Sequence, residues 1–139
     1  MNFELPYLPQ RASKPRVNGL TMMMDKGLSI RQVENFIETA GKLTDMVKFG
    51  FGTSIISPFL AEKIKLYQNA NIDVYLGGTL FEAFIARDRF EDYQRMLDKY
   101  NINTVEVSDG SIEISHKEKC NFISKLNFAS VQSVGILNS

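Results

Sequence analysis

IDVYLGGTLFE, residues 72–82, is the stretch of sequence that decides the fold of this chain. A short apolar run ends in Gly77-Gly78, and Thr79 and Glu82 follow with the spacing of a capping box. In a capping box the first side chain accepts a hydrogen bond from a backbone N–H of the first helical turn. The stretch therefore predicts a β-strand that passes almost directly into an α-helix.

The same kind of apolar run occurs four more times along the chain. The five runs start 24 to 32 residues apart, which is the spacing of successive βα units. Strands that alternate with helices imply a parallel sheet covered by helices. The four further runs are LTMMMD from Leu20, DMVKFG from Asp45, TVEVSD from Thr104 and FASVQSVG from Phe128.

Helix starts are marked between these runs. Ser29 with Gln32, and Ser115 with Glu118, repeat the capping-box spacing, and Ser57-Pro58 offers a cap followed by proline at the first helical position. Each of these starts lies after an apolar run, so local capping and hydrophobic patterning predict the same alternation of strand and helix.

Two α/β architectures fit this alternation: a doubly wound open sheet and a (β/α)8 TIM barrel. A dinucleotide-binding sheet normally carries a GxGxxG turn after its first strand, and this chain has none there. Polar residues instead gather after each apolar run, where barrel enzymes place their functional residues. We therefore expect an irregular lead-in over 1–18 and, over 19–139, a partial barrel of four to five βα units.

Composition limits the partners of this protein. Its 139 residues include 16 basic and 16 acidic residues without a basic stripe, so nucleic-acid binding has little support. No apolar run approaches the length of a membrane span. Cys120 is the single cysteine and no CxxC spacing occurs, which fits a reducing compartment. We expect a cytoplasmic protein without nucleic-acid or membrane partners.

Charged residues lie where the predicted strands end. Because side chains alternate along a strand, Glu106 and Ser108 point to the same face of the sheet. If the polar faces of the strands point into the barrel, Lys48 points inward too and converges with Glu106 at the barrel mouth. A desolvated lysine has a lowered pKa and acts as an acid or base near neutrality. Aspartate and glutamate together hold Mg²⁺, and glycine-rich turns such as Gly77-Gly78 let backbone N–H groups approach an anion.

Each of these residues also has a structural interpretation. Lys48 and Glu106 would form an ion pair without catalytic consequence equally well. Asp25 and Asp109 lie at turns, where aspartate is common for backbone reasons alone. Gly77-Gly78 is also typical of a tight turn.

Four longer motifs are more specific than these single residues. GLTMMMDKGLS (19–29), VKFGFGTS (47–54), YLGGTLFE (75–82) and VEVSDGSIEIS (105–115) resemble, in order and spacing, the phosphosulfolactate synthase family. The resemblance implies a (β/α)8 barrel that adds sulfite to phosphoenolpyruvate, giving 2-phospho-3-sulfolactate, a C–S bond-forming lyase reaction of coenzyme M biosynthesis with Mg²⁺ as cofactor. The family also includes plant heat-stress-associated proteins.

The resemblance also implies roles for the residues at the strand ends. Lys48 would be the acid that protonates the middle carbon after sulfite attack. The expected metal ligands are Glu106, Asp109 and Asp25, and the expected substrate-binding residues are Lys26, Gly77, Gly78, Thr79 and Ser108.

The likeness to the family covers only about the first half of a barrel. A full barrel needs roughly 250 residues. The family pattern at the fifth strand ends in Glu-Val-Gly followed by lysines, whereas Ser133-Val134-Gly135 is followed here by Ile136. We therefore expect a truncated synthase. The alternatives are a non-catalytic protein of the heat-stress-associated kind, which acts through protein interactions, and a half barrel that is active only as an assembled oligomer, either a homo-oligomer or a pair with another chain.

Overall fold

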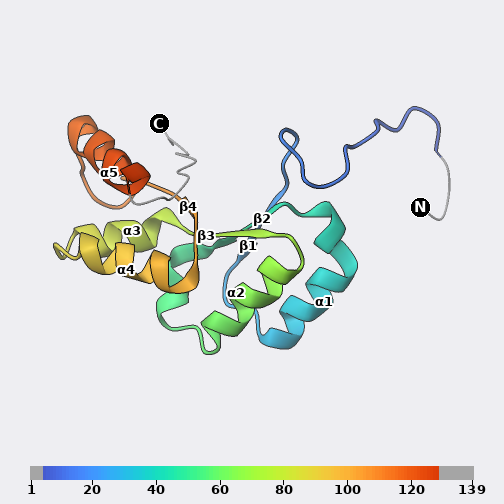
Figure 1. Cartoon of the computed structure of the whole chain (residues 1–139), viewed down its shortest axis with the longest axis horizontal. Coiled ribbons are helices and arrows are strands. Elements are labelled where there is room, and N and C mark those ends of the chain that lie inside the picture. Colours follow the sequence, from blue (N-terminus) through green and yellow to red (C-terminus); the bar gives the residue numbers. More distant parts are fainter. Residues whose placement is uncertain (1–4, 129–139) are drawn as a thin grey trace.

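A computed structural model describes residues 5–128 of the chain, and its centre is a four-stranded parallel sheet (Figure 1). The strands lie in the order β1-β2-β3-β4, so that each is paired with its neighbour in sequence. A doubly wound sheet reverses its strand order, whereas a barrel does not. The strands are β1 (Met22–Asp25), β2 (Met46–Phe49), β3 (Asp73–Leu76) and β4 (Thr104–Val105).

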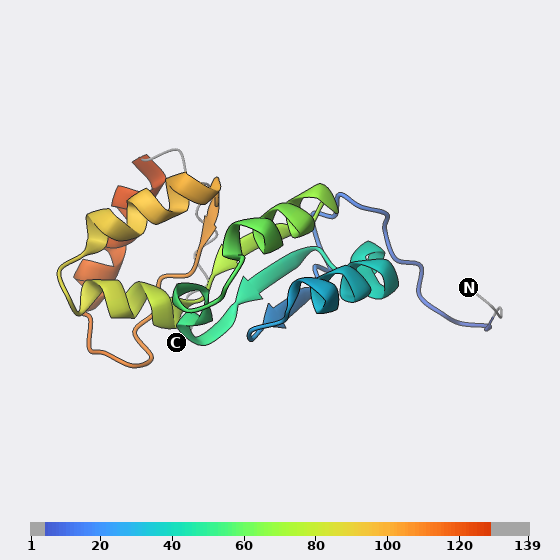
Figure 2. The ribbon, with the colours of Figure 1, turned by 90° about the horizontal axis from the view of Figure 1, so that it is seen from below.

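Five α-helices follow the strands. α1 and α2 lie together on one face of the sheet, while α3, α4 and α5 gather beyond the carboxyl ends of the strands (Figures 1 and 2). Within residues 5–128 no helix has the length and apolar character needed to span a membrane. The helices are α1 (Ile30–Ala40), α2 (Leu60–Asn69), α3 (Gly78–Ile85), α4 (Phe90–Tyr100) and α5 (His116–Phe128), with 3-10 turns at Gly41–Leu43 and Gly50–Ile55.

Of the four predicted helix starts, two are confirmed and two are wrong. The capping boxes at Ser29 and Ser115 are confirmed, because each serine exchanges hydrogen bonds with the residue three positions later. The starts predicted at Ser57 and Thr79 are wrong. α2 begins at Leu60, and α3 begins one residue before Thr79 because Gly77 takes the extended N-cap conformation. The fifth predicted strand lies outside the described residues, apart from Phe128, which ends α5.

The register of the sheet divides its side chains between two faces. Asp25, Phe49, Leu76 and Val105 are lateral neighbours and form one row. This row faces the helices, since the ring of Phe49 packs edge-on against that of Tyr67 in α2, with 6.1 Å between ring centroids. The opposite row consists of Met24, Lys48, Tyr75 and Thr104.

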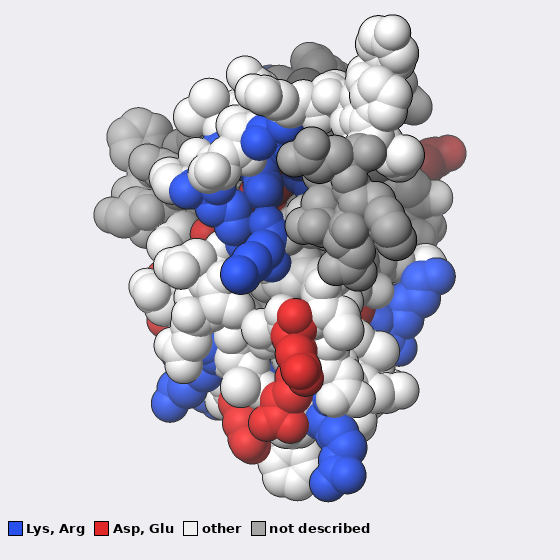
Figure 3. All heavy atoms as spheres, turned by 90° about the vertical axis from the view of Figure 1, so that its right-hand side faces the viewer, with Lys and Arg blue, Asp and Glu red and all other residues white. Residues whose placement is uncertain are grey.

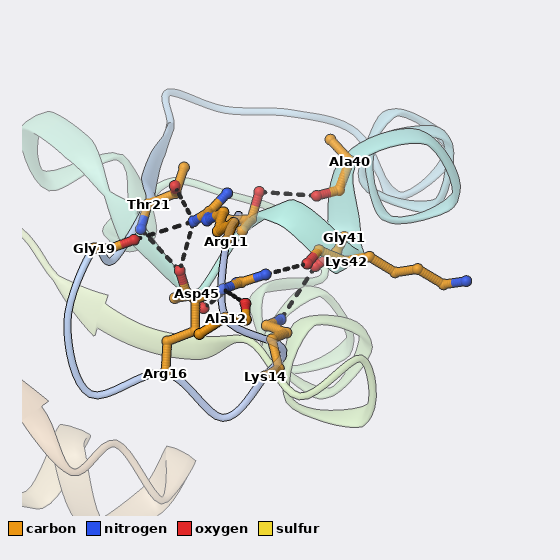
Figure 4. Close-up of polar contacts among 11 residues, drawn as sticks. Arg11, Ala12, Lys14, Arg16, Gly19, Thr21, Ala40, Gly41, Lys42 and Asp45 are labelled. Carbon is orange, nitrogen blue, oxygen red and sulfur yellow. Dashed lines mark hydrogen bonds and ion pairs between the residues drawn. The ribbon is translucent and has the colours of Figure 1, made fainter. Parts of the chain in front are cut away.

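The lead-in is fixed to the amino end of the sheet by a buried carboxylate, Asp45. Residues 5–21 contain no helix or strand. Asp45 accepts hydrogen bonds from Arg16 at 2.6 Å, from Arg11 at 3.2 Å and from the Thr21 N–H at 2.8 Å (Figure 4). Lys14 adds a bond of 3.1 Å from its Nζ to the carbonyl oxygen of Gly41.

Figure 3 looks onto this end of the molecule, where Lys and Arg side chains gather above a strip of Asp and Glu. The basic side chains of the lead-in mostly donate hydrogen bonds to acceptors within the protein. Arg16, for example, also donates to the carbonyl oxygens of Ala12 and Lys42. We therefore assign this basic cluster to holding the lead-in.

The stability of the protein should depend on pH through Asp45. Burial acts to raise the pKa of Asp45, but the Thr21 N–H and the guanidinium groups of Arg16 and Arg11 outweigh it and hold the pKa below its ordinary value of 3.8. A carboxyl with a depressed pKa stabilises the folded state fully above the unfolded-state pKa, and the stabilisation is lost as pH falls towards the folded-state pKa.

We expect Asp45→Asn to lower the melting temperature at pH 6, and the gap between the variant and the wild type to narrow as pH falls to about 3. Thermal unfolding followed by circular dichroism at each pH measures this gap. A gap that stays constant over the whole range would contradict the assignment.

Candidate active site

The carboxyl edge of the sheet is organised by an ion pair between Lys48 and Glu106. Lys48 is in β2, and Glu106 follows β4, so the pair crosses β3 to join two strands that are not neighbours. The Lys48 Nζ lies 2.6 Å from Glu106 Oε2, and the two side chains are 19% and 4% exposed. The predicted convergence of these residues is confirmed. Lys48 is reachable from solvent, whereas Glu106 is fixed in the protein.

Glu106 has a second partner at the start of α3. The Gly78 N–H donates to the same Oε2 at 3.0 Å. Beside Lys48 in the sheet lies Tyr75, which is buried. Burial, and after it the charge of Glu106, raises the pKa of Tyr75 to about 12, so Tyr75 is a neutral phenol near pH 7. A cation, an anion and a neutral hydroxyl side chain thus line this part of the site.

Gly77 and Gly78 are needed for close approach. A Cβ on Gly77 would lie 2.9 Å from Lys48 Cε and 3.0 Å from the Phe49 oxygen. A Cβ on Gly78 would lie 2.1 Å from Ser108 Oγ and 2.6 Å from Ser108 Cβ. Real Cβ atoms do not come this close to other heavy atoms, so any side chain at these positions would displace Lys48 or Ser108.

Asp25 lies apart from this pair, on the helix-facing row of the sheet. Its carboxylate is fully buried and accepts the N–H groups of Gly27 and Leu28, each at 2.8 Å. The other oxygen meets Lys63 Nζ at 2.8 Å and the hydroxyl of Tyr67 at 3.1 Å. The structure therefore does not bring Asp25 together with Glu106.

The two partners of Asp25, Lys63 and Tyr67, are themselves affected by their buried surroundings. Lys63 Nζ also lies 5.1 Å from the centroid of the Phe49 ring, a cation–π distance. Burial raises the pKa of Tyr67, and the charge and hydrogen bond of Asp25 add to the effect. The cluster ties the loop after β1 to α2.

The remaining predicted residues are spread around the same edge. Asp109 is paired with Lys119 of α5 at 2.9 Å. Lys26 is exposed, with its Nζ 5.3 Å from the centroid of the Phe51 ring in the loop after β2. Thr79 is exposed in the first turn of α3, and the hydroxyl of Ser108 donates to Glu82.

Most of the chain matches one protein family, since residues 9–136 correspond to the family described as (2R)-phospho-3-sulfolactate synthase (ComA). The chain belongs to this family. Curated relatives named phosphosulfolactate synthase are 36% identical over 117 residues in Methanothermobacter thermautotrophicus, 40% over 109 in Methanocaldococcus jannaschii and 33% over 116 in Bacillus subtilis. The resemblance inferred from the motifs is confirmed.

The matched regions make up 83%, 77% and 84% of this chain but 45%, 43% and 46% of those relatives, in the same order. The chain thus spans about half the length of the curated relatives it matches. The family has the TIM-barrel fold, and the four parallel strands in sequential order correspond to part of it.

The carboxylates expected to hold Mg²⁺ do not form a common site among residues 5–128. Asp25, Glu106 and Asp109 are each paired with a different lysine. Nowhere in this part of the chain do three or more His, Cys, Asp or Glu side chains lie close enough together to hold a metal ion. The described residues therefore do not fit a magnesium ion by themselves.

Sequence reasoning missed three residues of this edge, Lys63, Glu82 and Lys119, all of which lie on helices. For Lys63 a signal exists: Leu60, Ile64 and Tyr67 form an apolar stripe of α2, and Lys63 falls on it. For Glu82 the sequence is misleading, because its spacing from Thr79 imitates a capping box. Its carboxylate instead bonds to the loop after β4.

Substitution of Gly78 tests the close approach at this edge. We expect Gly78→Ala to lower the free energy of unfolding by about 1–3 kcal/mol, because its Cβ would push against Ser108. Gly41→Ala is the matched control, since its Cβ would meet Ile37 at no less than 3.4 Å. Urea unfolding of both variants measures the difference, and equal effects would contradict the explanation.

Removal of Lys63 tests the Asp25 cluster. We expect Lys63→Met to cost about 3–5 kcal/mol of unfolding free energy, because it leaves the Asp25 carboxylate buried without its cation. Lys65→Met, at an exposed position of the same helix, should change stability by less than about 0.5 kcal/mol. If the two variants unfold at the same urea concentration, the ion pair contributes no stability.

Proposed function

We propose that this chain carries a phosphosulfolactate synthase site at the carboxyl edge of its sheet, where sulfite adds to phosphoenolpyruvate to give 2-phospho-3-sulfolactate. Family membership supports the reaction class, and the Lys48–Glu106 ion pair supports the place. A partly exposed lysine beside a buried carboxylate is the kind of group that delivers a proton to bound substrate. The protein would act in the cytoplasm.

The proposed reaction needs one nucleophile and one proton. The sulfur of sulfite forms a bond to the methylene carbon of phosphoenolpyruvate. The C=C π electrons move to the middle carbon and delocalise into the carboxylate as an enediolate-like species. Transfer of a proton from the Lys48 ammonium to the middle carbon completes the product, and solvent then returns a proton to Lys48.

Glu106 has two tasks in this proposal. It holds the Lys48 Nζ at 2.6 Å, and it keeps that group oriented until the proton is needed. The Gly78 N–H in turn fixes the Glu106 carboxylate, so the acid is positioned by a helix start and not by a flexible loop. Lys26, exposed at the same edge, is a candidate contact for the anionic groups of the substrate.

Magnesium is the expected cofactor of the reaction, and the proton transfer from Lys48 does not depend on it. Glu106 is engaged with Lys48, while Asp25 and Asp109 are held elsewhere. Barrel enzymes frequently bind phosphate at loops after strands seven and eight, beyond the four strands described here. Association of two copies of this chain would be seen as a doubled mass in solution.

Lys48→Met is the decisive substitution. We expect it to lower sulfite-dependent consumption of phosphoenolpyruvate by about 10²- to 10⁴-fold, the usual contribution of a general acid. Lys65→Met removes an exposed lysine from α2 and should keep the wild-type rate. Product formation is followed by ³¹P NMR with Mg²⁺ present.

Two results would contradict the proposal. Wild-type turnover by Lys48→Met would remove Lys48 from the mechanism while leaving the reaction itself intact. A wild-type protein that neither binds nor consumes phosphoenolpyruvate would overturn the proposed function.

A further inference from the structure

We propose that Glu82 is a positioning residue of this site, which holds the loop after β4 so that Ser108 and Glu106 keep their places beside Gly78. This role rests on the function proposed above. Glu82 lies in α3, and its carboxylate touches neither Lys48 nor any other cation among the ion pairs of residues 5–128. Its partners all belong to one loop.

That loop supplies three hydrogen-bond donors to Glu82. Gly110 donates its N–H to Oε1 at 3.0 Å, and Ser111 donates its N–H to Oε2 at 2.6 Å. The hydroxyl of Ser108 also donates to Oε1. Two backbone N–H groups and one hydroxyl, all within residues 108–111, therefore donate to a single carboxylate.

The burial of Glu82 makes this arrangement informative. Glu82 is 3% exposed, and its neighbours Leu80 and Phe81 are buried in the core. A carboxylate without an ion-pair partner is costly to bury unless hydrogen bonds satisfy it. An apolar residue would pack here without that cost, so the carboxylate is explained by the loop that it holds.

The loop that Glu82 holds packs against the carboxyl edge of the sheet. Ser108 lies over Gly78, where an added Cβ would be only 2.1 Å from Ser108 Oγ and 3.4 Å from Glu106 Cδ. The N–H of Gly78 donates to Glu106, and Glu106 holds Lys48. Release of the loop would therefore loosen Glu106 and, through it, the proposed acid.

The hydrogen bond from Ser108 to Glu82 also determines whether Ser108 can donate a hydrogen bond to a substrate. A serine hydroxyl has one proton, and that of Ser108 is donated to Glu82. Ser108 is left with lone pairs that accept hydrogen bonds, so it does not donate to an anion while Glu82 holds it. Ser108 therefore leaves hydrogen-bond donation to the phosphate and carboxylate groups of a substrate to other residues of the edge.

Amide hydrogen exchange tests the loop assignment without any substrate. We expect Glu82→Ala to accelerate exchange of the Gly110 and Ser111 amides by about tenfold or more, since both lose a charged acceptor. The Gly27 and Leu28 amides, held by Asp25, should not change. Glu82→Gln keeps the shape and one acceptor oxygen, so it should show a smaller effect and remains informative if Glu82→Ala does not fold.

Phosphoenolpyruvate affinity, measured by ³¹P NMR titration well below the melting temperature, tests positioning. We expect affinity to weaken about tenfold in Glu82→Ala and less in Glu82→Gln, whereas Glu91→Ala, at an exposed position of α4, should bind as the wild type does. A residue with a merely structural role would lower the melting temperature and leave the affinity of the folded protein unchanged.

The possible failures are distinguishable. Unchanged exchange at Gly110 and Ser111 in both Glu82 variants would overturn the loop assignment, whatever the protein binds. Faster exchange with unchanged affinity would overturn positioning alone. Absence of phosphoenolpyruvate binding by the wild type would overturn the proposed function, while the exchange result would still decide whether Glu82 holds the loop.

Discussion

The carboxyl edge of this sheet depends on a contact that passes over two glycines, Gly77 and Gly78, which link β3 to α3. Lys48 reaches Glu106 over Gly77, and Glu106 reaches the backbone of Gly78. Both contacts need the space that a Cβ would fill. Because neither glycine has a positive φ here, the requirement is one of volume and not of backbone conformation.

Buried carboxylates anchor the loops at this edge in a common way. Asp25 accepts N–H groups of the loop after β1, and Glu82 accepts those of the loop after β4. A carboxylate gains more from such charge-assisted bonds than a neutral acceptor does. Loops that carry reactive groups are thereby fixed by short-range hydrogen bonds to rigid elements, which keeps Lys48 and its partner in register with α3.

The parts of the structure that follow from strand periodicity could be predicted from the sequence. The parity of Lys48 and Glu106 and the sequential parallel sheet depend on alternation along a strand, which is visible in one dimension. The partners of Asp25 and Glu82 depend on which helix packs against which loop, and that is settled by tertiary contacts. Lys63 shows the difference: its place on the apolar stripe of α2 signals burial, but only the folded chain shows that Asp25 receives it.

The attachment of the lead-in has a practical consequence for handling the protein. Arg11 and Arg16 are bound to Asp45 at the amino end of the strands, while Lys48 faces the opposite end. A surface tether or affinity label attached to the described part of the lead-in would lie on the side of the sheet away from the ion pair (Figure 1). A sensor chip loaded through such a label would present the carboxyl edge, with its loops, to the flowing solution.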